Sequence, residues 1–370
     1  MEITNVTAST HLVPVDVPLR DEVKRRRVVV ASVETDEGIT GHGVAAKPQW
    51  FGIRSLINEE VGPFVEGMNP LETERIYKQS QLEINPRYQT GVWHSAMSAV
   101  DIALWDIAGK YHGEPVWRLL GGAQNPVDAY VTFGLKNFNR EQLAEVAADF
   151  ASQGETRLKL KVGINGADDL PEDEARVAAV REAVGDDVEL MIDANHEFSV
   201  NQAIKLCERL EEYDITWFEE PVYANDADLL AKLRERTTIP ISAGQNDGGR
   251  YQHRKLVQRG AVDIVQPNVV YNGGYTEGRK IAHLAQAYNL DIANGGGWPH
   301  HNAHLHAGME NGWRVEYHYI MYRVGEKLFD DPPHIDGNEV ELSEEPGLGF
   351  EPDPDALDEY EVTSTADVDW

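Results

Sequence analysis

The sequence predicts an α/β fold: a (β/α)-barrel that follows a smaller domain of mixed strands and helices. Two observations predict it. After Gly121-Gly122, short apolar runs that end in polar residues recur, and a helix-like segment follows each run. Successive run ends lie 22 to 32 residues apart, which is about the length of one strand, one crossover helix and their loops. The run ends are Thr132, Lys161, Asp193, Glu219, Gln245, Asn268, Asn294 and Glu316.

Residues 1–124 are expected to form the smaller domain, of α+β type. Two β-branched segments, 27–35 and 39–44, flank a turn that contains Gly38, which predicts a hairpin. From His94 to Tyr111 the apolar residues recur every three or four positions, which predicts a helix. The glycine pair at 121–122 ends this region and is the expected boundary.

Residues 125–325 are expected to form the barrel from eight successive units. An open doubly wound sheet is the alternative, because it has the same alternation of strands and helices. No Gly-x-Gly-x-x-Gly follows a strand in the expected context, which disfavours a dinucleotide-binding sheet. Residues 326–370 are rich in Pro, Gly and Asp, and we expect this tail to pack back on the first domain.

The net charge of -30 is the unusual feature of the composition. The acidic residues are spread along the chain, and such a surface keeps a protein soluble where salt screens repulsion. Our hypothesis is a cytoplasmic protein from a high-salt organism, with an ordinary acidic mesophilic protein as the alternative. Nucleic acid is a poor partner for this surface, because binding phosphate needs a basic patch.

Neither a membrane nor secretion is indicated. No run of about 18 apolar residues occurs, and the first residues lack a basic segment followed by an apolar stretch. The single cysteine, Cys207, excludes an intrachain disulfide framework. We therefore expect a cytoplasmic protein without a membrane partner.

Polar residues at the strand ends are the candidates for chemistry, since they converge at the carboxyl-terminal rim of a barrel. Lys159 and Lys161 lie two apart in Arg-Leu-Lys-Leu-Lys-Val-Gly, so both side chains point to the same face of a strand. An outward, solvated pair is the alternative to a functional pair. The alternating leucines and the following Val162-Gly163 favour a strand inside the barrel.

Two carboxylates close the next two runs, Asp193 in Leu-Met-Ile-Asp-Ala-Asn and Glu219 in Trp-Phe-Glu-Glu-Pro. Carboxylates at successive rim positions suit a hard divalent cation such as Mg²⁺, which prefers oxygen ligands. Each could instead cap or begin a helix, which is common in loops that follow strands. Their position beside paired lysines favours the metal.

These motifs occur in an order that resembles the mandelate racemase and muconate lactonising branch of the enolase superfamily. Lys-x-Lys, Asp-x-Asn and Glu-Glu-Pro are followed by Val265-Gln-Pro-Asn268, Asn272-Gly-Gly274 and Pro346-Gly-Leu-Gly349. The helix at 99–110 and Leu119-Leu-Gly-Gly122 resemble the segment that leads into the family's barrel. The resemblance covers nearly the whole chain. It implies a modified (β/α)7β TIM-like barrel, with a capping domain formed by the N-terminal part and the C-terminal tail.

The resemblance also implies the roles of individual residues. Asp193 and Glu219 would ligate Mg²⁺, Lys161 would be the base, and Lys159 would be its electrostatic neighbour. Glu316 would hydrogen-bond the substrate carboxylate, although an ion pair with Arg314 is the alternative. Glu220 would hold a lysine or a water. Removing a proton beside a carboxylate places a second negative charge next to the first, and Mg²⁺ stabilises the resulting enediolate.

Three departures from the family pattern qualify this assignment. The usual third acidic ligand is replaced by Gln245, whose amide oxygen can ligate a hard cation; Asn246 or Asp247 is the alternative. Asn268 stands where the racemase pattern has an Asp, and no histidine follows near Asn294, so two-base racemisation is disfavoured. A histidine cluster follows at 300–306.

Within that cluster, His300 or His301 is the candidate acid facing Lys161, and His304 and His306 are expected to be buried or capping helix residues. A zinc site made by these histidines is the alternative on spacing. In the first domain, His11, Lys47, Trp50 and Phe51 are the candidates for specificity contacts.

The predicted function is a Mg²⁺-dependent lyase, a hydro-lyase that dehydrates a sugar acid, either an aldonate or an aldarate. A racemase, epimerase or cycloisomerase of the same superfamily is the first alternative, and a non-catalytic metal- or ligand-binding relative is the second. The expected partner is a small-molecule carboxylate, and the resemblance implies a homo-oligomer.

Overall fold

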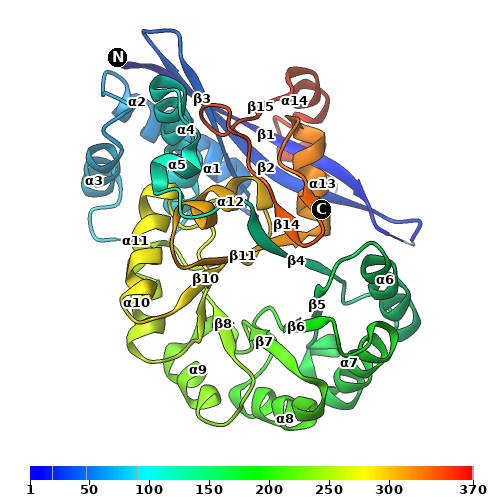
Figure 1. The fold of residues 1–370 in the computed structure, drawn as a ribbon. Helices are drawn as coiled ribbons and strands as arrows, with labels where there is room; N and C mark the ends of the chain where they lie inside the picture. The colour runs from blue at the N-terminus through cyan, green and yellow to red at the C-terminus, as the bar shows by residue number, and fades with distance from the viewer. Residues whose placement is uncertain (19, 47, 89–90, 369–370) are drawn as a thin grey trace.

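The structure is a computed structural model that describes residues 1–18, 20–46, 48–88 and 91–368. Figure 1 shows a ring of strands and helices with an antiparallel sheet and the end of the chain lying against one side. None of the helices in these described ranges has both the length and the apolar character that crossing a bilayer requires.

The N-terminal domain is built on the three-stranded antiparallel sheet β1-β2-β3. The predicted hairpin is confirmed as β2 and β3, and the predicted helix is confirmed as α4. Helix α4 packs closely on β3, because a β-carbon placed on Gly41 or Gly43 would lie 2.1 Å from a backbone oxygen of α4. The elements of this domain are β1 (Ile3–Asp16), β2 (Val23–Thr35), β3 (Thr40–Ala45), α1 (Trp50–Leu56), α2 (Gly62–Val65), α3 (Thr73–Ile84), α4 (Trp93–His112) and α5 (Val116–Leu120).

The barrel consists of eight parallel strands, and pairing between the last strand and the first closes it. Closure confirms the predicted barrel and excludes the open doubly wound sheet. The strands are β4 (Val127–Gly134), β5 (Arg157–Lys161), β6 (Glu189–Asp193), β7 (Ile215–Glu219), β8 (Ile241–Ala243), β9 (Ile264–Val265), β10 (Asp291–Ala293) and β11 (Gly312–His318). The helices between and after them are α6 (Arg140–Ser152), α7 (Leu170–Val184), α8 (Val200–Leu210), α9 (Ala227–Arg234), α10 (Gly249–Gln258), α11 (Gly274–Gln286), α12 (Pro299–Gly308) and α13 (Tyr319–Leu328).

The end of the chain joins the two parts. Helix α13 contacts β1 and β2, and α14 contacts β1, so the tail returns to the N-terminal sheet. The predicted boundary after residue 325 falls inside α13, whereas that after residue 124 lies between α5 and β4. The tail elements are β12 (Phe329–Asp330), β13 (Ile335–Asp336), β14 (Glu339–Val340), β15 (Glu351–Pro352) and α14 (Pro354–Tyr360).

Candidate active site

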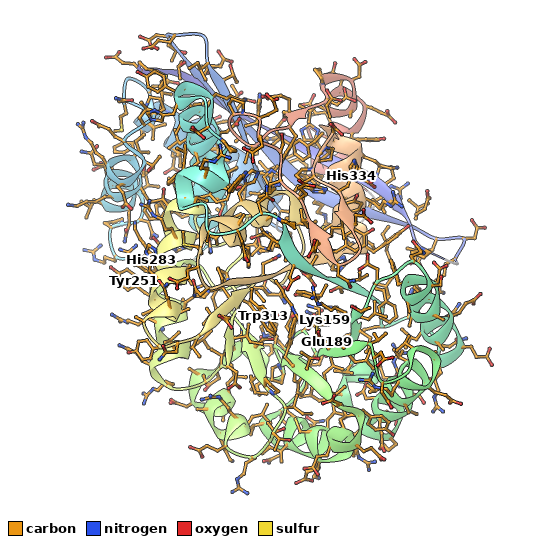
Figure 2. The ribbon with its side chains drawn as sticks, in the orientation of Figure 1. Lys159, Glu189, Tyr251, His283, Trp313 and His334 are labelled. Carbon is orange, nitrogen blue, oxygen red and sulfur yellow. The ribbon has the colours of Figure 1, made fainter. Side chains whose placement is uncertain are left out.

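Strand register brings the predicted charged residues together at the rim. In the parallel pairing, Lys161 lies opposite Asp193, and Asp193 lies opposite Glu219. Lys159, Asp193 and Glu219 are at most 1 % exposed, and Figure 2 shows Lys159 within the ring of barrel strands. The lysines therefore point into the barrel, and the alternative of an outward, solvated pair is wrong.

Lys159 is a fixed cation among buried carboxylates. Its Nζ lies 2.8 Å from Glu316 Oε1 and 4.0 Å from Asp193 Oδ2, and it also donates to Glu219 Oε2. Burial opposes a charged ammonium, but the negative charges of Glu219 and Glu316 outweigh burial and raise the pKa of Lys159 well above its usual value. The residue stays protonated and neutralises part of the negative charge around it.

Lys161 lies nearer the mouth of the barrel and is partly exposed. Its Nζ donates to Asp193 Oδ2 and, at 2.6 Å, to Asn195 Oδ1. Burial opposes ionisation of Asp193, but the positive charges of Lys161 and Lys159 outweigh burial and hold the pKa of Asp193 below its usual value. The two lysines thus share one carboxylate from different depths.

The oxygens beside these lysines fit a hard cation. Glu219 Oε1 is buried and has no hydrogen-bond partner among the described residues, whereas Oε2 accepts from Lys159 and Gln266. Burial raises the pKa of Glu219 to about 8. A β-carbon placed on Gly295 would lie 2.8 Å from Glu219 Oε1 and 2.9 Å from Gln245 Oε1, so both oxygens border one small space.

Glu219 and Gln245 thus turn one carboxylate and one amide oxygen toward this space. Asp193, which lies opposite Glu219 in the strand pairing, is the second carboxylate that would complete the predicted donor set. Within the described ranges, no group of three or more His, Cys, Asp or Glu residues is arranged to hold a metal by itself. The zinc alternative for the histidine cluster is therefore wrong. The oxygen-only set is the type that Mg²⁺ takes, with water completing its octahedron.

Glu220 orients the amide of Gln245. Its Oε2 accepts from Gln245 Nε2 at 2.5 Å and pairs with His196 Nε2 at 3.0 Å, while Oε1 accepts from Asn225 at 3.0 Å. Because the Gln245 nitrogen is held by Glu220, its oxygen faces Gly295. Amide and imidazole groups surround Glu220, so the expectation that it would hold a lysine is wrong.

Asn268 fixes a loop and does not orient an imidazole. Its Nδ2 donates to the backbone oxygens of Gly295 and Gly297, at 2.7 and 3.2 Å. Its Oδ1 accepts from Val270 N at 3.0 Å and from Asn302 Nδ2 at 3.2 Å. These contacts use both ends of the amide, and no histidine among the described residues pairs with it.

The structure does not bring His300 or His301 to Lys161. Both rings are fully buried between α12, α13 and the tail. His300 stacks on Tyr322 with ring centroids 5.1 Å apart, and His301 meets Phe350 at 5.3 Å and Phe329 at 5.5 Å. Burial lowers the pKa of His300 to about 3. Both side chains lie in an aromatic core rather than at the rim.

Glu316 lies in the site, as the sequence predicts, and its alternative pairing is wrong. Its Oε1 also accepts from Thr132 at 2.5 Å, and its Oε2 accepts from Gly297 N at 2.5 Å. Arg314 is instead held by Glu189 through two hydrogen bonds of 2.7 and 2.9 Å. Glu316 therefore ties Lys159 to the loop that closes the site.

Sequence reasoning missed His318, which lies two residues after Glu316 on β11 and so on the same strand face. Its Nδ1 is buried without a partner among the described residues. Burial lowers the pKa of His318 to about 4; the positive charges of Lys161 and Arg26 act in the same direction, and Glu316 opposes them. Strand alternation from Glu316 was the available pattern that could have identified this histidine.

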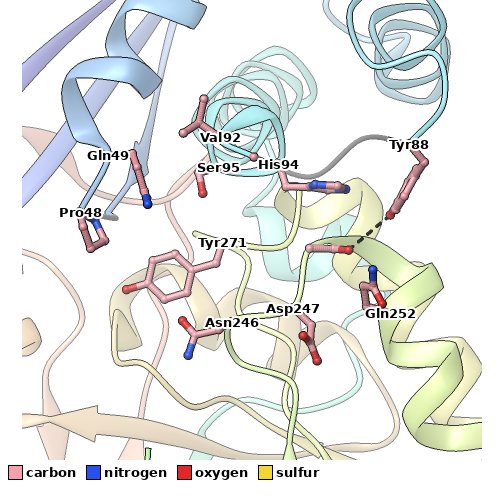
Figure 3. A pocket seen from close by; sticks show the side chains of 12 residues that line it. Pro48, Gln49, Tyr88, Val92, His94, Ser95, Asn246, Asp247, Gln252 and Tyr271 are labelled. Atoms are coloured by element: carbon pink, nitrogen blue, oxygen red, sulfur yellow. Dashed lines mark hydrogen bonds between the residues drawn. The ribbon is translucent and has the colours of Figure 1, made fainter. Parts of the chain in front are cut away.

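Two cavities, of about 540 and 460 Å³, lie between the N-terminal domain and the rim, and both are lined by Pro48, Asn246 and Tyr271. Figure 3 shows the first, with Tyr271 and Asn246 on one side and Ser95 and His94 across from them. Of the predicted specificity contacts, His11 and Trp50 are buried in the domain itself, and Lys47 lies outside the described residues.

The chain belongs to the mandelate racemase and muconate lactonizing enzyme family of the enolase superfamily. Residues 1–121 match the model of the mandelate racemase / muconate lactonizing enzyme N-terminal domain, and residues 142–356 match the enolase C-terminal domain-like model. Members of this superfamily are metal-dependent barrel enzymes that use Mg²⁺, which agrees with the fold and with the oxygen donor set.

Relatives carry several activities. D-galactarolactone cycloisomerase of Agrobacterium fabrum is 36 % identical over 79 % of this chain and 78 % of its own length. Arabinonate dehydratase of Saccharolobus solfataricus is 29 % identical over 91 % of both chains. A racemase from Streptomyces coelicolor A3(2), solved with bound magnesium, superposes with a TM-score of 0.89 at 28 % identity over 97 % of this chain and 100 % of its own.

Proposed function

We propose that this protein is a Mg²⁺-dependent hydro-lyase that dehydrates a sugar acid. The observation that carries the proposal is the one-sided arrangement of the site. A lysine base lies at the rim, and the place of a second base is taken by Asn268, whose amide bonds to the loop at 295–302 and to Val270 N. One base suits elimination better than inversion, which needs a proton donor on each face of the carbon.

Asp193, Glu219 and Gln245 would hold Mg²⁺, which supplies positive charge for the enediolate that forms from the substrate carboxylate. Lys161 Nζ takes the proton from the α-carbon. Lys159 remains charged and holds Glu219 and Glu316 in place. The electron pair of the broken C–H bond forms the new C=C bond as the C–O bond to the β-hydroxyl breaks.

His318 is the group we assign to protonate the departing hydroxyl, which leaves as water. It lies at the rim, its imidazole is within electrostatic reach of Lys161, and its Nδ1 has no partner within the described ranges. The negative charge of a bound acid favours the protonated imidazole that this step needs. The product enol then becomes a 2-keto-3-deoxy acid.

The test is incubation with Mg²⁺ and a panel of sugar acids in D₂O, with semicarbazide to trap keto acids. Dehydration yields a trapped keto acid, whereas epimerisation yields only deuterium incorporation and inversion. Lys161→Ala should abolish both exchange and product. His318→Gln should retain α-proton exchange while dehydration falls by roughly 10²-fold. The absence of exchange with every acid would refute the proposal.

Cycloisomerisation is the second candidate, favoured by the relative from Agrobacterium fabrum that is 36 % identical. It needs the same lysine base and the same stabilised enediolate, and differs in the group that leaves the β-carbon. Turnover of a sugar lactone, with none of the matching open-chain acid, would favour this candidate over dehydration.

We also propose that the enzyme works in a high-salt cytoplasm, which the net charge of -30 supports. Unfolding on transfer from molar KCl to dilute buffer is expected, because weaker screening strengthens repulsion among the acidic side chains. Indifference to salt would contradict it. A homo-oligomer remains part of the proposal, and a solution mass equal to one chain would contradict that part.

A further inference from the structure

The cavity of about 460 Å³ has an unusual lining for so acidic a protein. Arg25, Arg26 and Arg27 of β2 all line it, and no Asp or Glu occurs among its lining residues within the described ranges. Acidic residues outnumber basic ones by 63 to 33 in the whole chain, so a cavity wall with three arginines and no acidic residue differs from the overall composition. Such a wall attracts anions.

Arg26 is the arginine that faces the barrel. Side chains alternate along β2, and Val28 and Val30, two and four residues further on, pack in the core cluster that contains the barrel strands and α13. Val29 and Ala31 pack in the separate cluster with α4. Arg26 therefore lies on the face of the N-terminal sheet that covers the rim.

The guanidinium of Arg26 has donors to offer. Its Nε is buried and has no hydrogen-bond partner among the described residues. Burial lowers the pKa of Arg26, and its positive charge acts on both Tyr271 and His318. Arg26 lines the same cavity as Asn246, which directly follows Gln245, and as Tyr271, so Arg26 faces the loops of the barrel rim across that cavity.

We propose that Arg26 binds the distal carboxylate of a dicarboxylic sugar acid, so that the preferred substrate class is the aldarates rather than the aldonates. The inference rests on the proposed function, in which the near carboxylate of the substrate would lie at the Mg²⁺ held by Asp193, Glu219 and Gln245. A guanidinium offers two parallel N–H donors that match a carboxylate, and this geometry separates an acid group from a hydroxymethyl group at the far end of the substrate.

The experiment compares matched pairs of acids that differ only at the far carbon, such as galactarate and galactonate. Affinity is measured by titration calorimetry with Mg²⁺-loaded Lys161→Ala protein, which does not consume the acid. For acids whose α-proton the active enzyme exchanges, KM and kcat, measured for wild type and for each variant below with Lys161 intact, provide a second readout. The variants are Arg26→Gln, Arg26→Lys and the control Lys24→Gln. Lys24 lies on the same strand, pairs with Glu22 and does not line the cavity.

We expect an aldarate preference of about tenfold or more that Arg26→Gln removes and Lys24→Gln retains. Arg26→Lys should keep part of it, because the charge remains while the paired donors are lost. For an aldarate whose α-proton is exchanged, Arg26→Gln should raise KM with little change in kcat, since the distal contact is made equally in the ground and transition states.

Equal affinity for both classes, a preference for aldonates, or equal losses in Arg26→Gln and Lys24→Gln would overturn the inference. A lost aldarate preference in Arg26→Gln, combined with no α-proton exchange by the wild-type protein, would support the subsite and refute the proposed dehydration. If neither aldarates nor aldonates bind, both the subsite and the proposed dehydration are refuted.

Discussion

Lys159→Met removes the buried cation that contacts both Glu219 and Glu316, and leaves an apolar side chain of similar length. Glu219 and Glu316 then remain buried without their shared ammonium partner. Asp193 lies 4.0 Å from the position of the lost ammonium. Removing one partner of a buried ion pair costs about 3–5 kcal/mol, because the other charge is left uncompensated. We expect the free energy of unfolding in EDTA to fall by about that amount.

Excess Mg²⁺ should restore part of this loss. A ligand that binds only the folded state at 100 times its Kd contributes about 2.7 kcal/mol, and removal of the lysine charge should raise the affinity for a cation held by Asp193 and Glu219. The Mg²⁺-dependent stabilisation should therefore be larger in Lys159→Met than in wild type. α-Proton exchange should be lost in the variant even when Mg²⁺ is saturating.

Urea unfolding followed by circular dichroism, in EDTA and in excess Mg²⁺ at constant high KCl, measures both effects. Lys205→Met, at an exposed position of α8, is the matched control and should change neither value by more than about 0.5 kcal/mol. If Lys159→Met had the same free energy of unfolding as wild type in EDTA, the buried carboxylates would not be held as charges. A smaller effect of Mg²⁺ on the variant than on wild type would show that they do not ligate the ion.

The remaining predictions concern the third ligand, a buried acid and a buried histidine. Gln245→Ala should weaken Mg²⁺ binding by roughly tenfold in calorimetric titration, whereas Asn246→Ala should have a clearly smaller effect; equal losses would contradict Gln245 as the ligand. Burial raises the pKa of Asp101 to about 7, so the folded state retains a proton that the unfolded state has lost above pH 4. The contribution of Asp101 to stability should therefore fall by about 4 kcal/mol between pH 4 and 7, and Asp101→Asn should gain stability relative to wild type from pH 5 to pH 8 in urea unfolding. His300→Asn should lower the unfolding midpoint while the rate of α-proton exchange per folded molecule is retained; lost exchange at wild-type stability would place His300 in the site.

The barrel and its charged rim were predictable because both follow from short-range periodicity. Predicting a strand that ends in a polar residue every 22 to 32 positions requires no knowledge of distant contacts. The parallel register of the strands then aligns Lys161, Asp193 and Glu219. The same reasoning extends one step further to His318, which shares a strand face with Glu316.

The histidine cluster was not predictable in this way. His300 and His301 occur directly after a rim segment, so their position along the chain suggested the rim. Helix α12 is buried on all sides, however, and sequence spacing does not tell which of its faces meets the substrate. The rings lie against α13 and the tail, and those contacts join segments about 20 to 50 residues apart.

Arg26 was missed for a related reason. The predicted hairpin began at residue 27, one position after Arg26, whereas β2 begins at Val23. The face of the sheet that covers the barrel also depends on how two separate domains pack. A basic triplet in an acidic chain was visible in the sequence, and its position over the rim was not.

The difference between the two lysines follows from depth within the barrel. They share a strand face and lie two residues apart, which places them about 6.6 Å from one another along β5. The deeper Lys159 is enclosed, so its charge can be compensated only by carboxylates, and Glu219, Glu316 and Asp193 provide that compensation. Lys161 has one carboxylate and one amide and reaches the mouth, where a substrate can meet it. One residue type on one strand thus provides a buried cation that carboxylates compensate and, nearer the mouth, a partly exposed amine, because the barrel closes around the first and opens at the second.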